Sequence, residues 1–362
     1  MKIAFYNSSD GVYRLATGTL LTSGGAIKQQ WLLAKILVSK GYEVIFYTPT
    51  HNSEGLIREI EGIRFIQTPL ATTNLSLRRL FREEKPNWLY WRTNSMHLGP
   101  CFLLAKTVGI STVYACASDK DCDPKHALNP FSYRKYFWPF YLWGLKLADR
   151  ILVQHSGQLN LLGPKYASRT RIVNNIAVIP QFQKRSNDKP YIIWVGNLRF
   201  EKRPDLLVEI AQKLPHRNFK VCGAVLDYRS QRGYAQSISQ TLAALPNVEY
   251  LGAVSPEETI NLVGNAMLFL STSAQEGFPN TMLEAWSVGR PVVSLGLDPG
   301  SVITTNNLGR RTKDVSETIL IIEQLLENPS EISRIGQNCV RYIIENHSPI
   351  TVYQQFENAL IN

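Results

Sequence analysis

The chain carries its most informative stretch at residues 276–291, which read EGFPNTMLEAWSVGRP. A Gly/Pro turn here runs directly into an apolar helix, and a helix start presents free backbone N–H groups and a positive dipole end. Such a helix start binds phosphate. Glu276 lies before the helix and Glu284 about one turn inside it, where carboxylates accept hydrogen bonds from sugar hydroxyls. The stretch therefore predicts a nucleotide-sugar site; the alternative is an ordinary surface turn that caps a helix.

Composition points to a globular protein of two domains. The chain has 362 residues, of which 44% are hydrophobic and 19% charged, and this length is enough for two hydrophobic cores. It contains no run of about twenty apolar residues that would cross a membrane. The first residues enter a strand without a signal-peptide pattern, and five cysteines without a Cys-x-x-Cys pair indicate reduced thiols. We expect a cytoplasmic protein.

The excess of positive charge is confined to the first half of the chain. Net charge is +10; residues 1–170 hold 21 Lys and Arg against 11 Asp and Glu, whereas residues 171–362 hold 18 of each. Such asymmetry predicts a negatively charged partner for the first half. An anionic membrane surface, a lipid phosphate and nucleic acid all fit the charge, but no nucleic-acid-binding motif is present, so we expect no nucleic acid.

Two series of alternating strands and helices divide the chain. Strands are predicted at 2–6 and 43–47 with a helix at 26–40 between them, and further strands at 64–67, 88–91, 112–115 and 151–154. Polar residues 181–190 look like a linker. A second series begins at 191–195 and continues with strands at 220–222, 248–250, 267–270 and 291–294. Alternation of this kind predicts parallel α/β sheets, in Rossmann-like domains of residues 1–182 and 190–345.

The stretch at 276–291 resembles the donor-site signature of the retaining glycosyltransferases of family 4. The resemblance rests on Glu276-Gly277-Phe278-Pro279, Leu283-Glu284-Ala285 and Gly289-Arg290-Pro291-Val292-Val293. It implies an α/β fold of the GT-B type, in which two Rossmann-like domains face one another across a ligand cleft. It also implies that the C-terminal helix, residues 346–362, packs back on the first domain.

The resemblance assigns roles to residues of the second domain. Glu276, Lys202 and Arg199 would be catalytic: Lys202 fits the family's Lys position, and Asn197 occupies the position of the family's Arg, so Arg199 is expected to supply that cation. Donor-binding residues would be Gly24, Gly25, Gly196, Asn197, Ala253, Val254, Gly277, Phe278, Pro279, Asn280, Thr281 and Glu284. Ala253 and Val254 would contact the nucleobase through their backbone. Ser255, with Glu258 three residues on, also forms a capping-box pattern.

The first domain departs from the family pattern at the end of one strand. Many members have a His there, whereas this chain has Ser118 and Asp119, which we expect on the acceptor side. Asp119, Asp121 and Asp123 would suit a metal, but the resemblance implies that cations and helix dipoles neutralise the diphosphate, so no metal and no cofactor are expected. His51, His97, His126 and His155 show no ligand spacing and are interpreted as structural or surface residues.

The segment 131–143, FSYRKYFWPFYLW, packs aromatic residues among basic ones. It fits a membrane-interface or lipid-acceptor surface or, equally, a core helix. With the basic first half, it favours peripheral attachment to the inner face of a membrane.

The predicted reaction is the transfer of a sugar, with retention, from a nucleoside-diphosphate sugar to an acceptor hydroxyl. The acceptor would be lipid-linked or a saccharide, in glycolipid or surface polysaccharide synthesis. The alternative is a non-catalytic nucleotide-sugar-binding scaffold of the same fold, which Asn197 and the missing His suggest. A nicotinamide-dependent oxidoreductase would need a Gly-x-Gly-x-x-Gly fingerprint, which the chain lacks.

Overall fold

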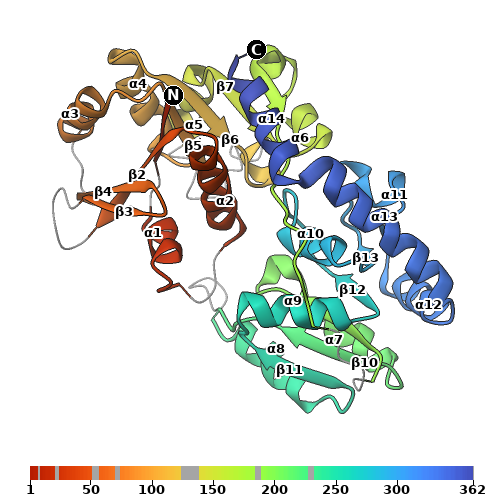
Figure 1. Ribbon diagram of the computed structural model, residues 1–362. Coiled ribbons are helices and arrows are strands. Elements are labelled where there is room, and N and C mark those ends of the chain that lie inside the picture. Colours follow the sequence, from red (N-terminus) through yellow and green to blue (C-terminus); the bar gives the residue numbers. More distant parts are fainter. Residues whose placement is uncertain are drawn as a thin grey trace. The chain divides into compact units, whose positions relative to one another are not determined.

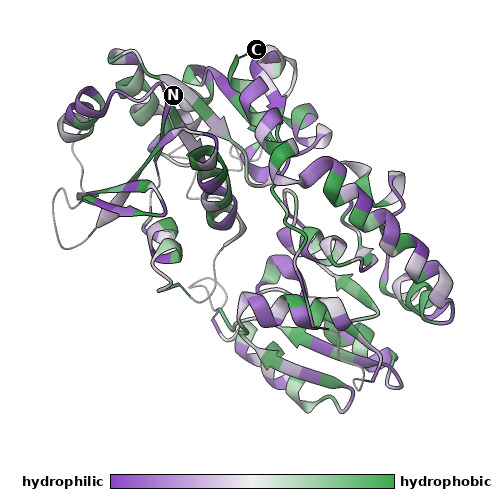
Figure 2. Ribbon diagram, in the orientation of Figure 1, coloured by the Kyte–Doolittle hydropathy of each residue, from purple (hydrophilic) through white to green (hydrophobic). Residues whose placement is uncertain are grey.

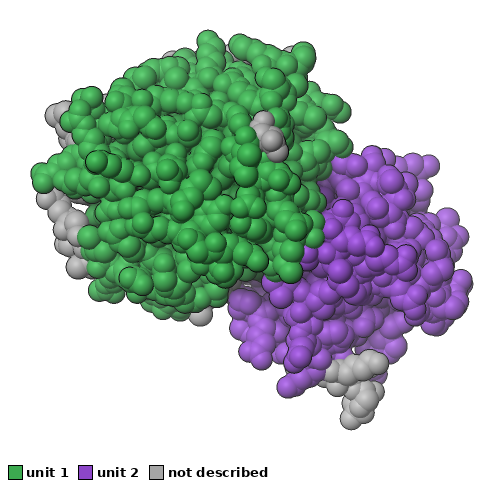
Figure 3. Space-filling model, turned by 45° about the horizontal axis from the view of Figure 1, so that its top comes forward, with its two compact units in different colours: residues 1–176, 349–362 green, residues 177–348 purple. Residues whose placement is uncertain are grey.

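The computed structural model describes residues 1–6, 9–20, 24–50, 57–69, 74–123, 138–183, 189–226 and 232–361. The chain forms two compact units, coloured separately in Figure 3. Unit 1 comprises Met1–Ile176 and Pro349–Asn362, and unit 2 comprises Ala177–Ser348. Each unit is an α/β structure built on its own sheet (Figure 1).

In the described part of unit 1, eight strands form one sheet in the order β3-β4-β2-β1-β5-β6-β7-β8. All neighbours are parallel except β3, which is antiparallel to β4. The strands are β1 (Lys2–Tyr6), β2 (Glu43–Thr50), β3 (Ile57–Ile60), β4 (Ile63–Pro69), β5 (Trp88–Arg92), β6 (Ser111–Ala115), β7 (Arg150–Val153) and β8 (Thr170–Ile172). The helices are α1 (Gly11–Ala16), α2 (Gly25–Ser39), α3 (Asn74–Glu84), α4 (Leu98–Thr107), α5 (Trp138–Leu147), α6 (Ser156–Leu162), α14 (Pro349–Ile361) and the 3₁₀ helices η1 (Asp119–Asp121) and η4 (Pro164–Arg169).

Successive side chains of the unit 1 strands enter two separate cores. Ile3 and Phe5 of β1 pack with α2 and α14, whereas Ala4 packs on the other side with residues of α3, α4 and α5. Because helices cover both faces of the sheet, its inner strands are hydrophobic throughout instead of alternating with polar residues. The predicted strands at 2–6 and 43–47 and the helix between them are confirmed. The predicted strand at 64–67 lies within β4, whereas β3, its antiparallel neighbour, and α1 were not predicted.

Helix α14 completes the core of unit 1 although its residues come last. Phe356 is 1% exposed and contacts the ring of Tyr90 on β5. The guanidinium of Arg150 donates to the carbonyl of Ala359 at 2.8 Å, and Gln355 accepts from the backbone of Asn174 at 2.9 Å. The helix therefore belongs to the folded structure of unit 1.

In the described part of unit 2, six parallel strands form a sheet in the order β11-β10-β9-β12-β13-β14. The strands are β9 (Tyr191–Val195), β10 (Asn218–Cys222), β11 (Val248–Gly252), β12 (Leu268–Ser271), β13 (Val292–Leu295) and β14 (Gly309–Thr312). The helices are α7 (Pro204–Lys213), α8 (Tyr234–Ala244), α9 (Pro256–Asn265), α10 (Asn280–Ser287), α11 (Val302–Thr305), α12 (Val315–Leu326), α13 (Pro329–His347) and the 3₁₀ helices η5 (Phe200–Lys202) and η7 (Pro299–Ser301).

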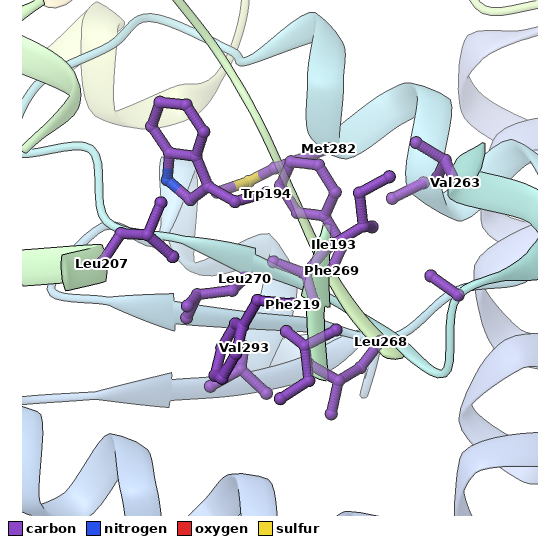
Figure 4. Packing of buried hydrophobic residues seen from close by; sticks show 14 of the residues in the cluster. Ile193, Trp194, Leu207, Phe219, Val263, Leu268, Phe269, Leu270, Met282 and Val293 are labelled. Atoms are coloured by element: carbon purple, nitrogen blue, oxygen red, sulfur yellow. The ribbon is translucent and has the colours of Figure 1, made fainter. Parts of the chain in front are cut away.

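The core of unit 2 lies on the central strands. Figure 4 shows Ile193 and Trp194 of β9 with Phe269 of β12 and Met282 of α10, all of them buried. Helices α12 and α13 carry both hydrophobic and hydrophilic residues (Figure 2), as expected for helices with one face on a core. The predicted strands of this half all overlap observed ones; β14 and α12 were not predicted.

The aromatic segment is both core and surface where the structure describes it. Residues 131–137 lie outside the described part. Within α5, Tyr141 is 5% exposed, whereas Phe140 is 43% and Trp143 is 36% exposed. In the described part of the chain no helix has the length and hydropathy needed to cross a membrane.

Candidate functional site

The unit 2 sheet reverses its direction of growth between β9 and β12. From β9 the chain adds β10 and β11 on one side, and β12, β13 and β14 then follow on the other side. In open parallel sheets, ligands bind at the carboxyl ends of the strands where such a reversal occurs. The loops that follow β9 and β12 meet at this point, and they carry many of the residues predicted to bind the donor.

An ion pair joins these two loops: the ammonium of Lys202, in η5 after β9, contacts the carboxylate of Glu276, in the loop after β12. Both side chains are about one-fifth exposed. Further hydrogen bonds fasten the loops together. The hydroxyl of Thr272 donates to the Lys202 carbonyl at 2.7 Å, and the Ala274 amide donates to the Glu201 carbonyl at 2.9 Å. The backbone at Glu201 and Lys202 is therefore fastened to the loop that carries Glu276.

Helix α10 begins at Asn280, directly after the second loop, with Pro279 as its N-cap. Phe278 is 5% exposed and anchors this turn against the rings of Trp286 and His347. Gly277 and Pro279 are also buried, whereas Asn280, Thr281 and Glu284 are partly exposed. The N-terminus of α10 is thus held rigidly at the switch point, with backbone N–H groups at its first turn.

The loop after β9 passes very close to the end of β10. A Cβ atom on Gly223 would lie 1.8 Å from the Gly196 carbonyl oxygen, so this approach requires glycine at 223. Asn197 lies beside it and accepts a hydrogen bond from the Ala224 amide at 3.3 Å. The Asn197 side chain thus holds the loop after β9 to the chain that follows β10. Arg199, two residues later, is the N-cap residue of η5 and is partly exposed.

Ala253 and Val254 follow the edge strand β11 at the same carboxyl edge of the sheet. Ala253 is exposed and Val254 is partly buried. Ser255 caps α9, since its hydroxyl accepts from the Glu258 amide at 3.2 Å, which confirms the predicted cap. The two residues before the cap, Ala253 and Val254, are both at least partly exposed.

In unit 1, Gly24 and Gly25 stand at the start of α2, on the chain segment that follows β1. Both are exposed. A Cβ atom on Gly24 would meet no described atom within 4 Å, and its φ of −64° is open to any residue. Neither packing nor backbone geometry in the described part therefore requires glycine at position 24.

The acidic cluster after β6 separates into carboxylates with different surroundings. Asp121 is 4% exposed and accepts backbone hydrogen bonds from Ala117, Ser118 and Asn94, and burial raises its pKa against these bonds. Asp121 is therefore a structural group. Asp119 is more exposed, at 30% of its side chain. Among the described residues, no group of three His, Cys, Asp or Glu lies close enough together to hold a metal ion.

The sequence predicts a structural or surface position for His155, and the structure places it more specifically. It lies two residues after β7 as the N-cap of α6, is 8% exposed, and has its Nε2 3.3 Å from Oδ1 of Asp119. Gln158 donates to the same carboxylate oxygen at 3.1 Å. The available signal was positional: a polar residue at the carboxyl end of a buried parallel strand lies where ligands bind.

A groove of about 710 Å³ lies elsewhere in unit 2, between the turn at Gly289 and Arg290 and helix α13. That turn precedes β13, so the groove lies near the amino-terminal ends of the strands. None of the predicted site residues lines it. The groove is therefore separate from the predicted donor site at the carboxyl edge.

Two Rossmann-like α/β units define the class of this protein as the GT-B fold. The chain superimposes on sucrose-phosphate synthase from Thermosynechococcus elongatus with a TM-score of 0.79, at 14% identity, over 99% of this chain and 98% of the other. It superimposes on HepE from Anabaena, solved in complex with UDP and glucose, with a TM-score of 0.75 at 17% identity, over 99% of each chain. At these identities the likeness shows the fold.

Residues 175–339, which form most of unit 2, match the family model described as "Glycosyl transferases group 1". A curated relative from Homo sapiens, one of the subunits of phosphatidylinositol N-acetylglucosaminyltransferase, is 25% identical over 300 residues. The matched region covers 75% of this chain and 59% of the relative, so the chain spans less than two thirds of that protein's length.

Proposed function

We propose that this protein is a retaining glycosyltransferase of family 4, which transfers a hexosyl group from a UDP-sugar to a hydroxyl group of a lipid or glycolipid. The observation that carries the proposal is the Lys202–Glu276 ion pair at the switch point of the unit 2 sheet, next to the N-terminus of α10. The Lys202 cation and the start of α10 can bind the diphosphate, and the Glu276 carboxylate can accept hydrogen bonds from the sugar hydroxyls. The family match and the UDP complex of HepE support this assignment.

Lys202 would stabilise the leaving diphosphate together with Arg199 and the first amides of α10, at Asn280 and Thr281. Negative charge grows on the phosphate oxygen as the bond to the anomeric carbon breaks, and fixed donors aimed at that oxygen lower the barrier. Without ligand, Glu276 balances the Lys202 charge. The diphosphate would replace Glu276 as the partner of Lys202, which requires no resident cofactor.

Glu276, once released, would accept hydrogen bonds from the sugar hydroxyls, and Glu284 those of the ribose. Ala253 and Val254 would contact the base, and Gly24, exposed and free of packing constraints in the described part, would let a phosphate approach α2. The acceptor oxygen forms its bond to the anomeric carbon on the face that the phosphate leaves. Its proton passes to the leaving phosphate oxygen, so the products are a glycoside and UDP.

A lipid acceptor is proposed from the human relative, whose name specifies phosphatidylinositol as acceptor. The decisive experiment offers UDP-glucose, UDP-galactose and UDP-N-acetylglucosamine, labelled in the sugar, with phosphatidylinositol or diacylglycerol in detergent micelles. Transfer of label to lipid, with the α-configuration of the donor kept in the product by NMR, is the expected result. A β-linked product would contradict retention.

Calorimetry with UDP measures nucleotide binding, and comparison with the transfer assay distinguishes a catalyst from a protein that only binds. Lys202→Ala and Glu284→Ala are expected to lose UDP affinity, whereas Lys213→Ala, a matched change of an exposed lysine on α7, should keep it. If wild-type protein binds UDP-sugars and neither transfers nor hydrolyses them, the scaffold alternative holds. If the folded protein binds none of them, the nucleotide-sugar site is wrong.

A membrane surface accompanies the lipid acceptor in this proposal. Leu103 on α4 and Phe140 and Trp143 on α5 are each more than one-third exposed. The two helices pack closely, since a Cβ atom on Gly99 would lie 3.0 Å from the Trp143 ring, and Leu103 is one turn from Gly99. Aromatic side chains beside the exposed Lys146 fit the interface of an anionic membrane.

Sedimentation with vesicles tests this surface. Wild-type protein should pellet with phosphatidylglycerol-containing vesicles and less with pure phosphatidylcholine, and salt should weaken the binding. Phe140→Ser and Trp143→Ser should reduce pelleting. Leu320→Ser, at a 56% exposed position of α12 in unit 2, is the matched control and should not. Equal loss in all three variants would overturn the assignment of the surface to α4 and α5.

A further inference from the structure

A continuous chain of polar side chains runs along the carboxyl edge of the unit 1 sheet, from the end of β5 to the end of β6. Arg92 Nη2 donates to Asn175 Oδ1 at 2.8 Å, and Gln154 Nε2 donates to the same oxygen at 2.9 Å. Gln158 Nε2 donates to Gln154 Oε1 at 3.2 Å and to Asp119 Oδ1 at 3.1 Å. The chain of hydrogen bonds thus ends on a carboxylate.

The direction of every hydrogen bond in this chain is fixed from both ends. The backbone amide of Gln154 donates to Gln158 Oε1 at 2.7 Å, which leaves Gln158 Nε2 as the group that faces Asp119. At the other end Arg92 has only donors, so Asn175 Oδ1 must accept and Gln154 Nε2 must donate. Neither glutamine amide can flip without losing hydrogen bonds. Asp119 therefore always meets a donor.

Exposure distinguishes Asp119 from the other members. Gln158 is 0% exposed, Gln154 and Asn175 are each 3% and His155 is 8%, whereas the Asp119 side chain is 30% exposed. Both neighbours of Asp119 contact Oδ1, and Oδ2 has no hydrogen bond to any residue in the described ranges. A buried network that served stability alone would satisfy itself within the core. This network ends on a partly exposed carboxylate and uses only its Oδ1 among the described residues.

We propose that Asp119 accepts a hydrogen bond from the acceptor hydroxyl through Oδ2, and that His155 and Gln158 are positioning residues that hold its carboxylate for this purpose. The inference rests on the proposed function and names the group of unit 1 that meets the acceptor. The imidazole Nε2 lies 3.3 Å from Oδ1 because His155 follows β7 while Asp119 follows β6, its neighbour in the sheet. A nucleophilic hydroxyl held in one orientation reacts faster because its freedom is already restricted.

The transfer assay above, with phosphatidylinositol micelles as the acceptor probe, tests the inference by substitution. Asp119→Asn keeps shape and removes the charge; it should lower kcat/KM for the acceptor about 10- to 100-fold, as expected for a lost hydrogen bond to a charged group. His155→Phe should reproduce part of this loss. His155→Gln, which restores an N–H donor, should recover activity. UDP affinity and slow hydrolysis of the UDP-sugar by water should stay unchanged in all three.

Equal loss of acceptor transfer and UDP-sugar hydrolysis, or unchanged acceptor kinetics in Asp119→Asn, would overturn the inference. A second readout does not depend on transfer. Nitrogen-detected NMR of the imidazoles, with His155→Gln to assign the signal, should show His155 carrying its proton on Nε2, and Asp119→Asn should shift that tautomer balance. If Asp119→Asn left the His155 signal unaltered, the contact with Asp119 would not set the His155 tautomer, and the inference would be wrong. If the wild-type protein did not bind UDP, that result would instead count against the proposed function.

Discussion

At the carboxyl edge of unit 2, Lys202 and Glu276 face each other as a charged pair, whereas in unit 1 the amide of Gln158 donates to Asp119 and the imidazole of His155 lies 3.3 Å from the same oxygen. The unit 2 pair balances itself, so a charged ligand must displace one member to bind the other. The contacts of the unit 1 carboxylate go to Oδ1, so a ligand that bound Oδ2 would not have to displace them. This difference agrees with the two proposed ligands: a diphosphate that exchanges ionic partners in unit 2, and a neutral hydroxyl that adds one hydrogen bond in unit 1.

The largest expected effect is on the charged pair of unit 2. Lys202→Ala should lower turnover of the UDP-sugar about 100- to 1000-fold, as for loss of one donor to a developing charge. Steady-state kinetics of UDP release measures it. Lys213→Ala on the same unit should change turnover less than twofold. A Lys202→Ala enzyme with normal turnover would show that unit 2 does not act through this cation.

A second contrast concerns the glycines at the two edges. Gly223→Ala would place a Cβ atom 1.8 Å from a backbone oxygen, and overpacking of this kind costs about 3 kcal/mol. Gly24→Ala meets no described atom within 4 Å and should leave stability unchanged. Thermal unfolding measures both. If Gly24→Ala proves as destabilising as Gly223→Ala, then Gly24 serves packing and its proposed role toward the donor falls.

Glu276→Gln sharpens the contrast in ionic partners. With its competing carboxylate removed, Lys202 should bind free UDP up to about fivefold more tightly, because a partly exposed ion pair is worth about 1 kcal/mol or less. Turnover of the UDP-sugar should nevertheless fall, because the sugar loses its proposed partner. Calorimetry and kinetics on one preparation give both numbers. Weaker UDP binding would contradict the exchange of partners.

The smallest effect concerns acid stability in unit 2, where Glu331 contacts Arg334 and Arg310. Hydrogen bonding to Arg334, and then to Arg310, lowers the pKa of Glu331 from 4.5 to about 2. A carboxyl whose pKa is lowered on folding stabilises the protein above pH 4.5 and loses this contribution as the pH falls to about 2. The Glu331→Gln variant should therefore be less stable than wild type at pH 6, by no more than about 1 kcal/mol because both arginines are substantially exposed, and the gap should close toward pH 2. A gap that is constant with pH would contradict it.

The sequence predicted the two units differently, and the reason is physical. In unit 2, residues 276–284 encode the loop, the helix start and two carboxylates within one contiguous stretch, so local pattern predicts the site. The partner of Glu276, Lys202, came from the family resemblance alone. In unit 1, His155 meets Asp119 only because β6 and β7 are neighbours, and strand adjacency cannot be read from either segment. Chain alternation predicted both sheets, whereas β3 was missed because its four residues are exposed or only partly buried and form no hydrophobic pattern.

The position of α14 in the chain has a consequence for synthesis. Unit 1 packs Val352, Phe356 and Leu360 into one of its two cores, yet a ribosome makes these residues only after the whole of unit 2. Unit 2 is contiguous and can fold as it emerges. The apolar face of β1, β2 and β5, in contrast, stays partly uncovered until α14 has been synthesised. Nascent unit 1 therefore exposes part of its hydrophobic core until α14 has been synthesised, and this is when it is most prone to aggregate.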